Sequence, residues 1–158
     1  KHFWSACIVD RPKTKKKLAG NIERYKDEGD FTAEEIIQFK ADLTGVFPLN
    51  LVITPEAIQQ LEQRGVPPIS EFDQDLLLCW FIPRKIVEKK TKRGKNYWIV
   101  EVVDSNNETE KIRCWGINPE KDFIHVNHPY MARLDYSPDW GFSTRCVGKT
   151  FKLIGSLK

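Results

Sequence analysis

The chain has 158 residues, of which 41% are apolar and 30% are charged, so it is long enough to fold around a buried core beneath a well-solvated surface. No run of 18 apolar residues occurs, and we therefore predict no membrane-spanning helix. The net charge of +3 is unevenly distributed, because residues 1–75 hold 10 basic and 13 acidic side chains whereas residues 76–158 hold 15 and 9. A basic second half is typical of nucleic-acid-binding proteins, although an ordinary solvated surface would also produce it.

The first 67 residues are predicted to be mainly helical. An apolar run from Phe3 to Val9 predicts a short strand or a buried arm, and the basic cluster Lys13 to Lys17 follows it. Apolar residues at helical spacing between 18 and 25 then predict a first helix. The capping-box pattern over residues 32–35 predicts the start of a second helix, and Thr54 followed by proline predicts a third.

From Leu76 onward the apolar period changes to two, which predicts strands. The expected strands cover residues 76–89, 97–104, 109–115, 129–136 and 142–154. Three strands in a meander and a longer connection before the fourth match the plan of the oligonucleotide-binding (OB) fold, and an SH3-like barrel stays open as an alternative. We therefore predict an α+β chain, with a helical segment and linker over residues 1–67 and a five-stranded OB-type β-barrel over residues 68–158.

Alternation along the second and third expected strands separates a core face from an outward face. The predicted core set is Trp98, Val100, Val102, Ile112 and Cys114. The outward set combines two aromatic rings with two cations, and OB folds bind single strands on this face. With the basic turn after the first strand and the region of the last two strands, the predicted nucleic-acid-binding set is Lys92, Arg93, Lys95, Tyr97, Lys111, Arg113, Trp115, Arg133, Tyr136 and Arg145. Each residue alone also has a structural explanation: Trp115 could pack on the helical half, and Trp140 in the last turn could pack locally.

Catalytic and metal-binding patterns are absent from the sequence. The four cysteines, at 7, 79, 114 and 146, form no Cys-x-x-Cys pair, and the three histidines have no ligand partner at metal-binding spacing. Phosphate loops and nucleophile elbows are also missing. We predict no catalytic site, no metal and no cofactor, and the isolated cysteines favour a reducing, cytoplasmic location. Because the chain begins with Lys1 rather than methionine, it is also expected to be part of a longer polypeptide.

Two segments resemble a known family. The stretch from Lys90 to Asp104, with its basic turn and alternating strand, is similar to the OB module of the C-family (bacterial-type) replicative DNA polymerase III alpha subunit, and residues 43–49 resemble the segment that precedes that module. The resemblance covers roughly residues 40–117; it departs from the family at Trp98 and at the turn Asn106–Asn107, as in a divergent, for example phage-encoded, member. It implies a sequence-independent grip on single-stranded DNA beside the catalytic domains of a DNA-directed DNA polymerase, with the rest of that chain and replisome proteins as partners.

Two other functions stay open at this point. The barrel could be a protein-interaction module that docks its aromatic face on a replisome partner. It could also be the tRNA-binding OB domain of an aminoacyl-tRNA synthetase, although the segment 43–49 favours the polymerase. Salt dependence separates nucleic-acid binding from apolar docking, because only the former releases counterions.

Overall fold

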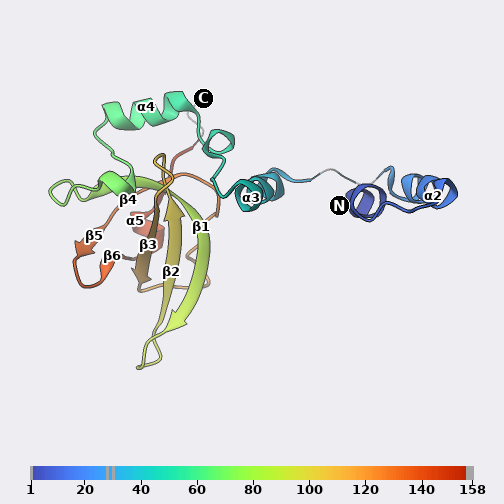
Figure 1. Ribbon diagram of the computed structural model, residues 1–158. Coiled ribbons are helices and arrows are strands. Elements are labelled where there is room, and N and C mark those ends of the chain that lie inside the picture. Colours follow the sequence, from blue (N-terminus) through green and yellow to red (C-terminus); the bar gives the residue numbers. More distant parts are fainter. Residues whose placement is uncertain (1, 28, 30, 156–158) are drawn as a thin grey trace. The chain divides into compact units, whose positions relative to one another are not determined.

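The computed structural model describes residues 2–27, 29 and 31–155 (Figure 1). The chain separates into two compact units, Lys1–Phe39 and Lys40–Lys158, and the predicted boundary between residues 67 and 68 lies inside the second unit. Among the described residues, no helix has both the length and the apolar character needed to cross a membrane.

The first unit is helical. Residues Phe3 to Val9 form part of helix α1 (His2–Trp4) and a π-helical turn (Ser5–Val9), so the predicted strand or arm is wrong. Helix α2 (Lys15–Tyr25) lies against this segment, and the side-chain amide of Asn21 donates to the Ala6 carbonyl at 3.0 Å. This bond ties the two helical segments of the unit together.

Two predicted helix starts are confirmed by their capping bonds. Helix α3 (Ala33–Thr44) runs from the first unit into the second. At its start, the Thr32 hydroxyl accepts from the Glu35 amide at 3.3 Å and the Glu35 carboxylate accepts from the Thr32 amide at 3.1 Å. Helix α4 (Pro55–Gln63) follows a 3₁₀ turn (Leu49–Leu51), and the Thr54 hydroxyl accepts from the Ala57 amide at 3.3 Å. These are the reciprocal and single caps that each sequence pattern predicts.

The second unit is built on one curled, mixed sheet. Its strands are β1 (Leu78–Lys90), β2 (Asn96–Val103), β3 (Thr109–Trp115), β4 (Tyr130–Arg133), β5 (Asp135–Ser137), β6 (Gly141–Arg145) and β7 (Lys152–Leu153). Their order is β5-β6-β3-β2-β1-β4-β7, and β3 and β6 are parallel whereas the other pairs are antiparallel. Strand β1 pairs with β4 from Leu78 to Phe81 and with β2 from Ile82 onward. A bulge between Pro83 and Lys85 interrupts the second pairing, and β1 curves from one part of the sheet to the other (Figure 1).

The predicted α+β order of helices followed by a curled sheet is confirmed. The predicted five-stranded closed barrel is wrong, because the sheet has seven strands and forms a half-barrel. The expected fourth strand is interrupted at Leu134, which is buried, and gives β4 and β5. The expected fifth strand ends at Arg145, because Cys146 adopts a left-handed conformation with φ 55° that cannot continue a strand. A short helix α5 (Val147–Thr150) follows, and the chain then returns beside β4 as β7.

The core lies within the curl of this sheet. Val100, Val102, Ile112 and Cys114 are fully buried, and Trp98 is half-buried against them, which confirms the predicted inward set. Phe81 and Phe151 meet edge-on with ring centroids 5.1 Å apart, so the segment after α5 also contributes to the core. The alternation of β2 and β3 therefore fixes which side chains face outward.

A buried carboxyl fastens the turn between β2 and β3 to the segment before β1. Asp104 is 2% exposed, and its side-chain oxygens accept from the amides of Ser70 at 2.8 Å, Asn106 at 2.9 Å and Glu108 at 3.3 Å. Ser70 belongs to a 3₁₀ turn (Ile69–Glu71) whose Ile69 lies in the core. One side chain thus satisfies backbone donors from two segments.

Candidate nucleic-acid interface

Four outward side chains form a line across the sheet. Lys89 of β1 lies opposite Tyr97 of β2, and Trp115 of β3 lies opposite Arg145 of β6. Tyr97 and Trp115 join the two pairs, because their rings stack with centroids 4.5 Å apart and an angle of 24° between the planes. We call these four residues the aromatic row; it places two rings between two cations.

The two rings of the aromatic row have different surroundings. Each covers one face of the other, so neither offers both faces to a ligand. Trp115 lines an open groove, whereas Tyr97 does not. Trp115 is therefore the ring available for stacking, and Tyr97 supports it from behind.

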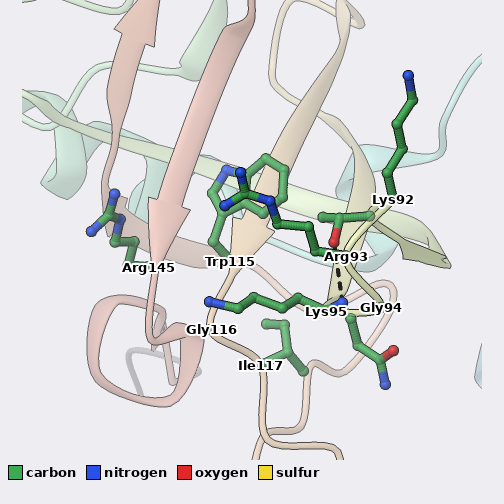
Figure 2. A pocket seen from close by; sticks show the side chains of 10 residues that line it. Lys92, Arg93, Gly94, Lys95, Trp115, Gly116, Ile117 and Arg145 are labelled. Atoms are coloured by element: carbon green, nitrogen blue, oxygen red, sulfur yellow. Dashed lines mark hydrogen bonds between the residues drawn. The ribbon is translucent and has the colours of Figure 1, made fainter.

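The groove beside Trp115 has a volume of about 1000 Å³ and is strongly basic. Of the ten described residues that line it, four are cations and none is acidic; the lining residues are Thr91, Lys92, Arg93, Gly94, Lys95, Asn96, Trp115, Gly116, Ile117 and Arg145. In Figure 2, Arg93 and Lys95 extend from the turn toward the side where Trp115 and Gly116 lie, whereas Lys92 extends away. We call this space the basic groove.

Backbone hydrogen bonds fix the shape of the turn after β1, which carries Lys92, Arg93 and Lys95. The Thr91 amide donates to the Lys95 carbonyl and the Gly94 amide to the Thr91 carbonyl, both at 2.9 Å. The Lys95 amide also donates to the Thr91 hydroxyl at 3.1 Å, the bond drawn in Figure 2. Gly94 has φ 77°, a conformation that favours glycine. The turn is closed by its own bonds, so its charged side chains are left for other contacts.

Two of the predicted phosphate contacts have protein partners. The Lys111 ammonium lies 3.6 Å from the carboxylate of Glu101, its neighbour across β2 and β3. The Arg113 guanidinium donates to the Trp140 carbonyl and lies 6.0 Å from the centre of the indole ring. Arg113 therefore positions the turn between β5 and β6, and this turn presents a Trp140 ring that is 66% exposed.

Arg133 and Tyr136 line no part of the basic groove. Arg133 is exposed on β4 opposite Leu78, and Tyr136 of β5 packs its ring 5.0 Å from that of Phe142. Of the ten predicted residues, the structure brings Lys92, Arg93, Lys95, Trp115 and Arg145 to one groove, with Tyr97 behind it. Lys89, which the sequence also indicates as part of the basic turn after the first strand, lies beside them opposite Tyr97. Ile117 lines the groove as well, although nothing in the sequence predicts it there.

The described residues contain no group of three His, Cys, Asp or Glu side chains placed to hold a metal ion. Burial raises the pKa of the Cys79 and Cys114 thiols to about 12, with the nearby charge of Asp104 adding to the effect at Cys79, so both thiols stay protonated at neutral pH. At the surface, the aromatic row offers a ring for stacking and the basic groove offers cations that attract anions.

Comparison of the sequence with models of known protein families and with curated proteins finds no match. The resemblance to the polymerase alpha subunit therefore stays a prediction.

Proposed function

We propose that the second unit is an OB-type barrel that binds single-stranded DNA without sequence preference. The order of its strands supports the OB interpretation. An OB fold closes five strands as a Greek-key barrel, with the fourth strand between the fifth and the first. Here β4 pairs with β1, β5 pairs with β6, and only Leu134 separates β4 from β5. The Leu134 amide donates to the Leu77 carbonyl at 2.8 Å, which extends the ladder between β1 and β4 through the break.

The observation that carries the binding proposal is the aromatic row beside the basic groove. A base stacked on the open face of Trp115 contributes ~1–3 kcal/mol, whichever base it is, because every base has a π-face. Arg145 flanks that ring and the basic turn lines the same groove, so the phosphates on either side of the stacked base meet cations. Stacking and phosphate contacts need no donors and acceptors that read base edges, so the proposed binding has no sequence preference.

The larger setting of this activity is proposed from the resemblance alone. A module of this kind in a replicative polymerase holds the single-stranded template near the catalytic domains, and its partners are the rest of the polymerase chain and other replisome proteins. In this proposal the described residues contribute binding, and the nucleotidyl transfer occurs in other domains.

The stacking role of Trp115 is tested by replacing it. Trp115→Ala should weaken binding of the chain to a fluorescent oligothymidylate by about 5- to 150-fold, the loss equivalent to ~1–3 kcal/mol of stacking. Phe123→Ala is the matched control, because Phe123 is 70% exposed and does not line the basic groove. Anisotropy titration measures both affinities, and thermal unfolding checks that both variants fold. Equal affinities for Trp115→Ala and the unchanged chain would exclude the groove as the binding site.

Salt dependence tests the electrostatic part and separates it from apolar docking. Each phosphate contact on a single strand contributes about 0.7 to the slope of log affinity against log salt, so Lys92→Gln, Lys95→Gln and Arg93→Gln together should reduce that slope by about 2. The control replaces three exposed lysines outside the groove, Lys121, Lys149 and Lys152, with glutamine. The control should keep the original slope. Equal changes in both variants would indicate general charge attraction, and competition by tRNA stronger than by oligothymidylate would favour the synthetase alternative.

A further inference from the structure

The first unit carries a cluster of positive charge that the proposed interface does not use. Residues 11–26 hold seven basic side chains and one acidic one, although the first 75 residues as a whole are net negative. All seven basic side chains are exposed. Within the part of the chain that the structure describes, Lys26 pairs with Glu23 at 2.6 Å, and Arg24 lies over the Tyr25 ring. The other five cations, which precede them in sequence, have no carboxylate within ion-pair distance among the described residues: Arg11, Lys13, Lys15, Lys16 and Lys17. We call these five residues the basic face.

The part of the basic face that lies on helix α2 is unfavourable for the stability of the helix. Three of its lysines occupy the first turn of α2, which contains no acidic residue, and the Thr14 side chain makes no capping bond. The positive end of the helix dipole lies at this turn, where cations are destabilising and anions are favoured. Helix α2 also buries no residue fully, so core packing does not explain the lysines. The arrangement is explained if an external anion neutralises it.

A groove on the same helix gives this anion a place to lie. Lys13, Lys17, Asn21 and Tyr25 follow one another at intervals of four residues and line a space of about 600 Å³ between α2 and the segment before it. The Tyr25 ring is flanked by the His2 ring at 5.9 Å and by the Arg24 guanidinium at 5.3 Å. Asp10 is the acidic residue among those that line the groove. Ammonium groups in line with an aromatic ring match a strand of phosphates and bases.

We propose that the basic face binds the phosphate backbone of the same single strand whose base stacks on Trp115. This inference rests on the proposed function and extends it to the first unit. The two units belong to one chain, so once one unit has bound a long strand the other binds it at a raised effective concentration. A strand too short to reach both units gains nothing from the basic face. The length of the strand therefore decides how much the first unit contributes.

The test compares a short and a long oligothymidylate on the full chain. The short one has about 6 nucleotides, within the site of a single OB fold, and the long one has about 40. Lys13, Lys15, Lys16 and Lys17 are replaced together by glutamine, and a second variant replaces the same four by arginine. The glutamine variant should keep its affinity for the short strand and lose roughly 100-fold for the long one. Its salt slope on the long strand should fall by about 3, whereas the arginine variant should match the unchanged chain on both strands.

The outcomes separate this inference from the proposed function. If the unchanged chain does not bind the short strand, or Trp115→Ala leaves that binding unaltered, the proposed function fails. If short-strand binding depends on Trp115 but the glutamine variant keeps its long-strand affinity, only the role of the basic face fails. A vesicle of phosphatidylserine and phosphatidylcholine serves as the other polyanion. Loss of vesicle binding in the glutamine variant, with unchanged long-strand affinity, would assign the basic face to a membrane surface and overturn the inference.

Discussion

Tyr97 and Trp115 have different positions in the proposed interface. Their rings stack with centroids 4.5 Å apart, and of the two only Trp115 lines the basic groove. In the proposed function Tyr97 restricts the orientation of the indole, which lowers the conformational entropy that a bound base would have to remove. The sequence predicts both as residues that stack directly on a base. Alternation shows on which face of the sheet a side chain lies, but not which of two neighbouring rings lines the groove.

This difference in role predicts different effects of substitution at Tyr97. Tyr97→Phe keeps the ring and should leave the affinity for oligothymidylate nearly unchanged. Tyr97→Ala removes the support and should weaken binding, by less than Trp115→Ala, because the base still has a ring to stack on. Anisotropy titration gives the affinities. The difference in tryptophan emission between each Tyr97 variant and the same variant carrying Trp115→Phe isolates Trp115 from the other four tryptophans, and reports whether its indole has become more exposed. A larger loss from Tyr97→Ala than from Trp115→Ala would show that Tyr97 contacts the base itself.

At the scale of elements, the turn between β2 and β3 depends on a single carboxyl. Asp104 accepts from three backbone amides and joins this turn to the 3₁₀ turn before β1. Asp104→Ala leaves these donors without their acceptor and should lower the free energy of unfolding by about 1–3 kcal/mol. Asp73→Ala is the matched control, because Asp73 is exposed and its carboxylate accepts from one backbone amide among the described residues, that of Asp75 at 2.8 Å. Urea denaturation followed by circular dichroism measures both; equal midpoints would show that Asp104 is not a fastening point.

The elements also show why part of the fold could be predicted and part could not. Strands β1 to β3 are joined by short polar turns, so their extents follow from local sequence. Alternation gives the faces of β2 and β3, whereas residues 79–83 of β1 are buried in succession. Strand β4 ends before Leu134, and β6 ends before Cys146, whose backbone is left-handed. Nothing in the sequence indicates that a cysteine adopts this conformation. The parallel pairing of β3 with β6 is a long-range contact, and it is this pairing that brings Arg145 beside Trp115 and Arg113 beside the turn of Trp140.

For the molecule as a whole, the positive charge is concentrated at particular places, which the small net charge does not show. One group of cations surrounds the basic groove in the second unit, and another forms the basic face of the first, whereas the net charge is only +3. Lys111, which lies elsewhere on the sheet, is paired with the Glu101 carboxylate. In the proposed function a single strand would therefore meet concentrated positive charge at two places, the basic groove and the basic face.

The cysteines provide a probe of the integrity of the second unit. Cys146 is exposed, whereas Cys79 and Cys114 lie in the core and burial raises the pKa of each to about 12 from an ordinary value of 9.0. The thiolate is the form that reacts, so an alkylating reagent at neutral pH should modify Cys146 quickly and the two core thiols only when the unit unfolds. Peptide mass mapping over time identifies each site.

The same pKa shifts set the direction of the pH dependence. Well below pH 9 both core thiols are protonated in the folded and the unfolded chain, and the thiols add no dependence on pH. Between pH 9 and about 12 the unfolded chain loses these protons while the folded chain keeps them, so their contribution favours unfolding as the pH rises. Modification of Cys79 and Cys114 should therefore accelerate above pH 9 by more than the ionisation of a free thiol explains, and Cys114→Ala should reduce that excess at Cys79. Modification of Cys79 at the same rate as Cys146 in the folded chain would show that Cys79 is not buried. The core would then differ from the one described, and so would the assignment of outward side chains on β2 and β3.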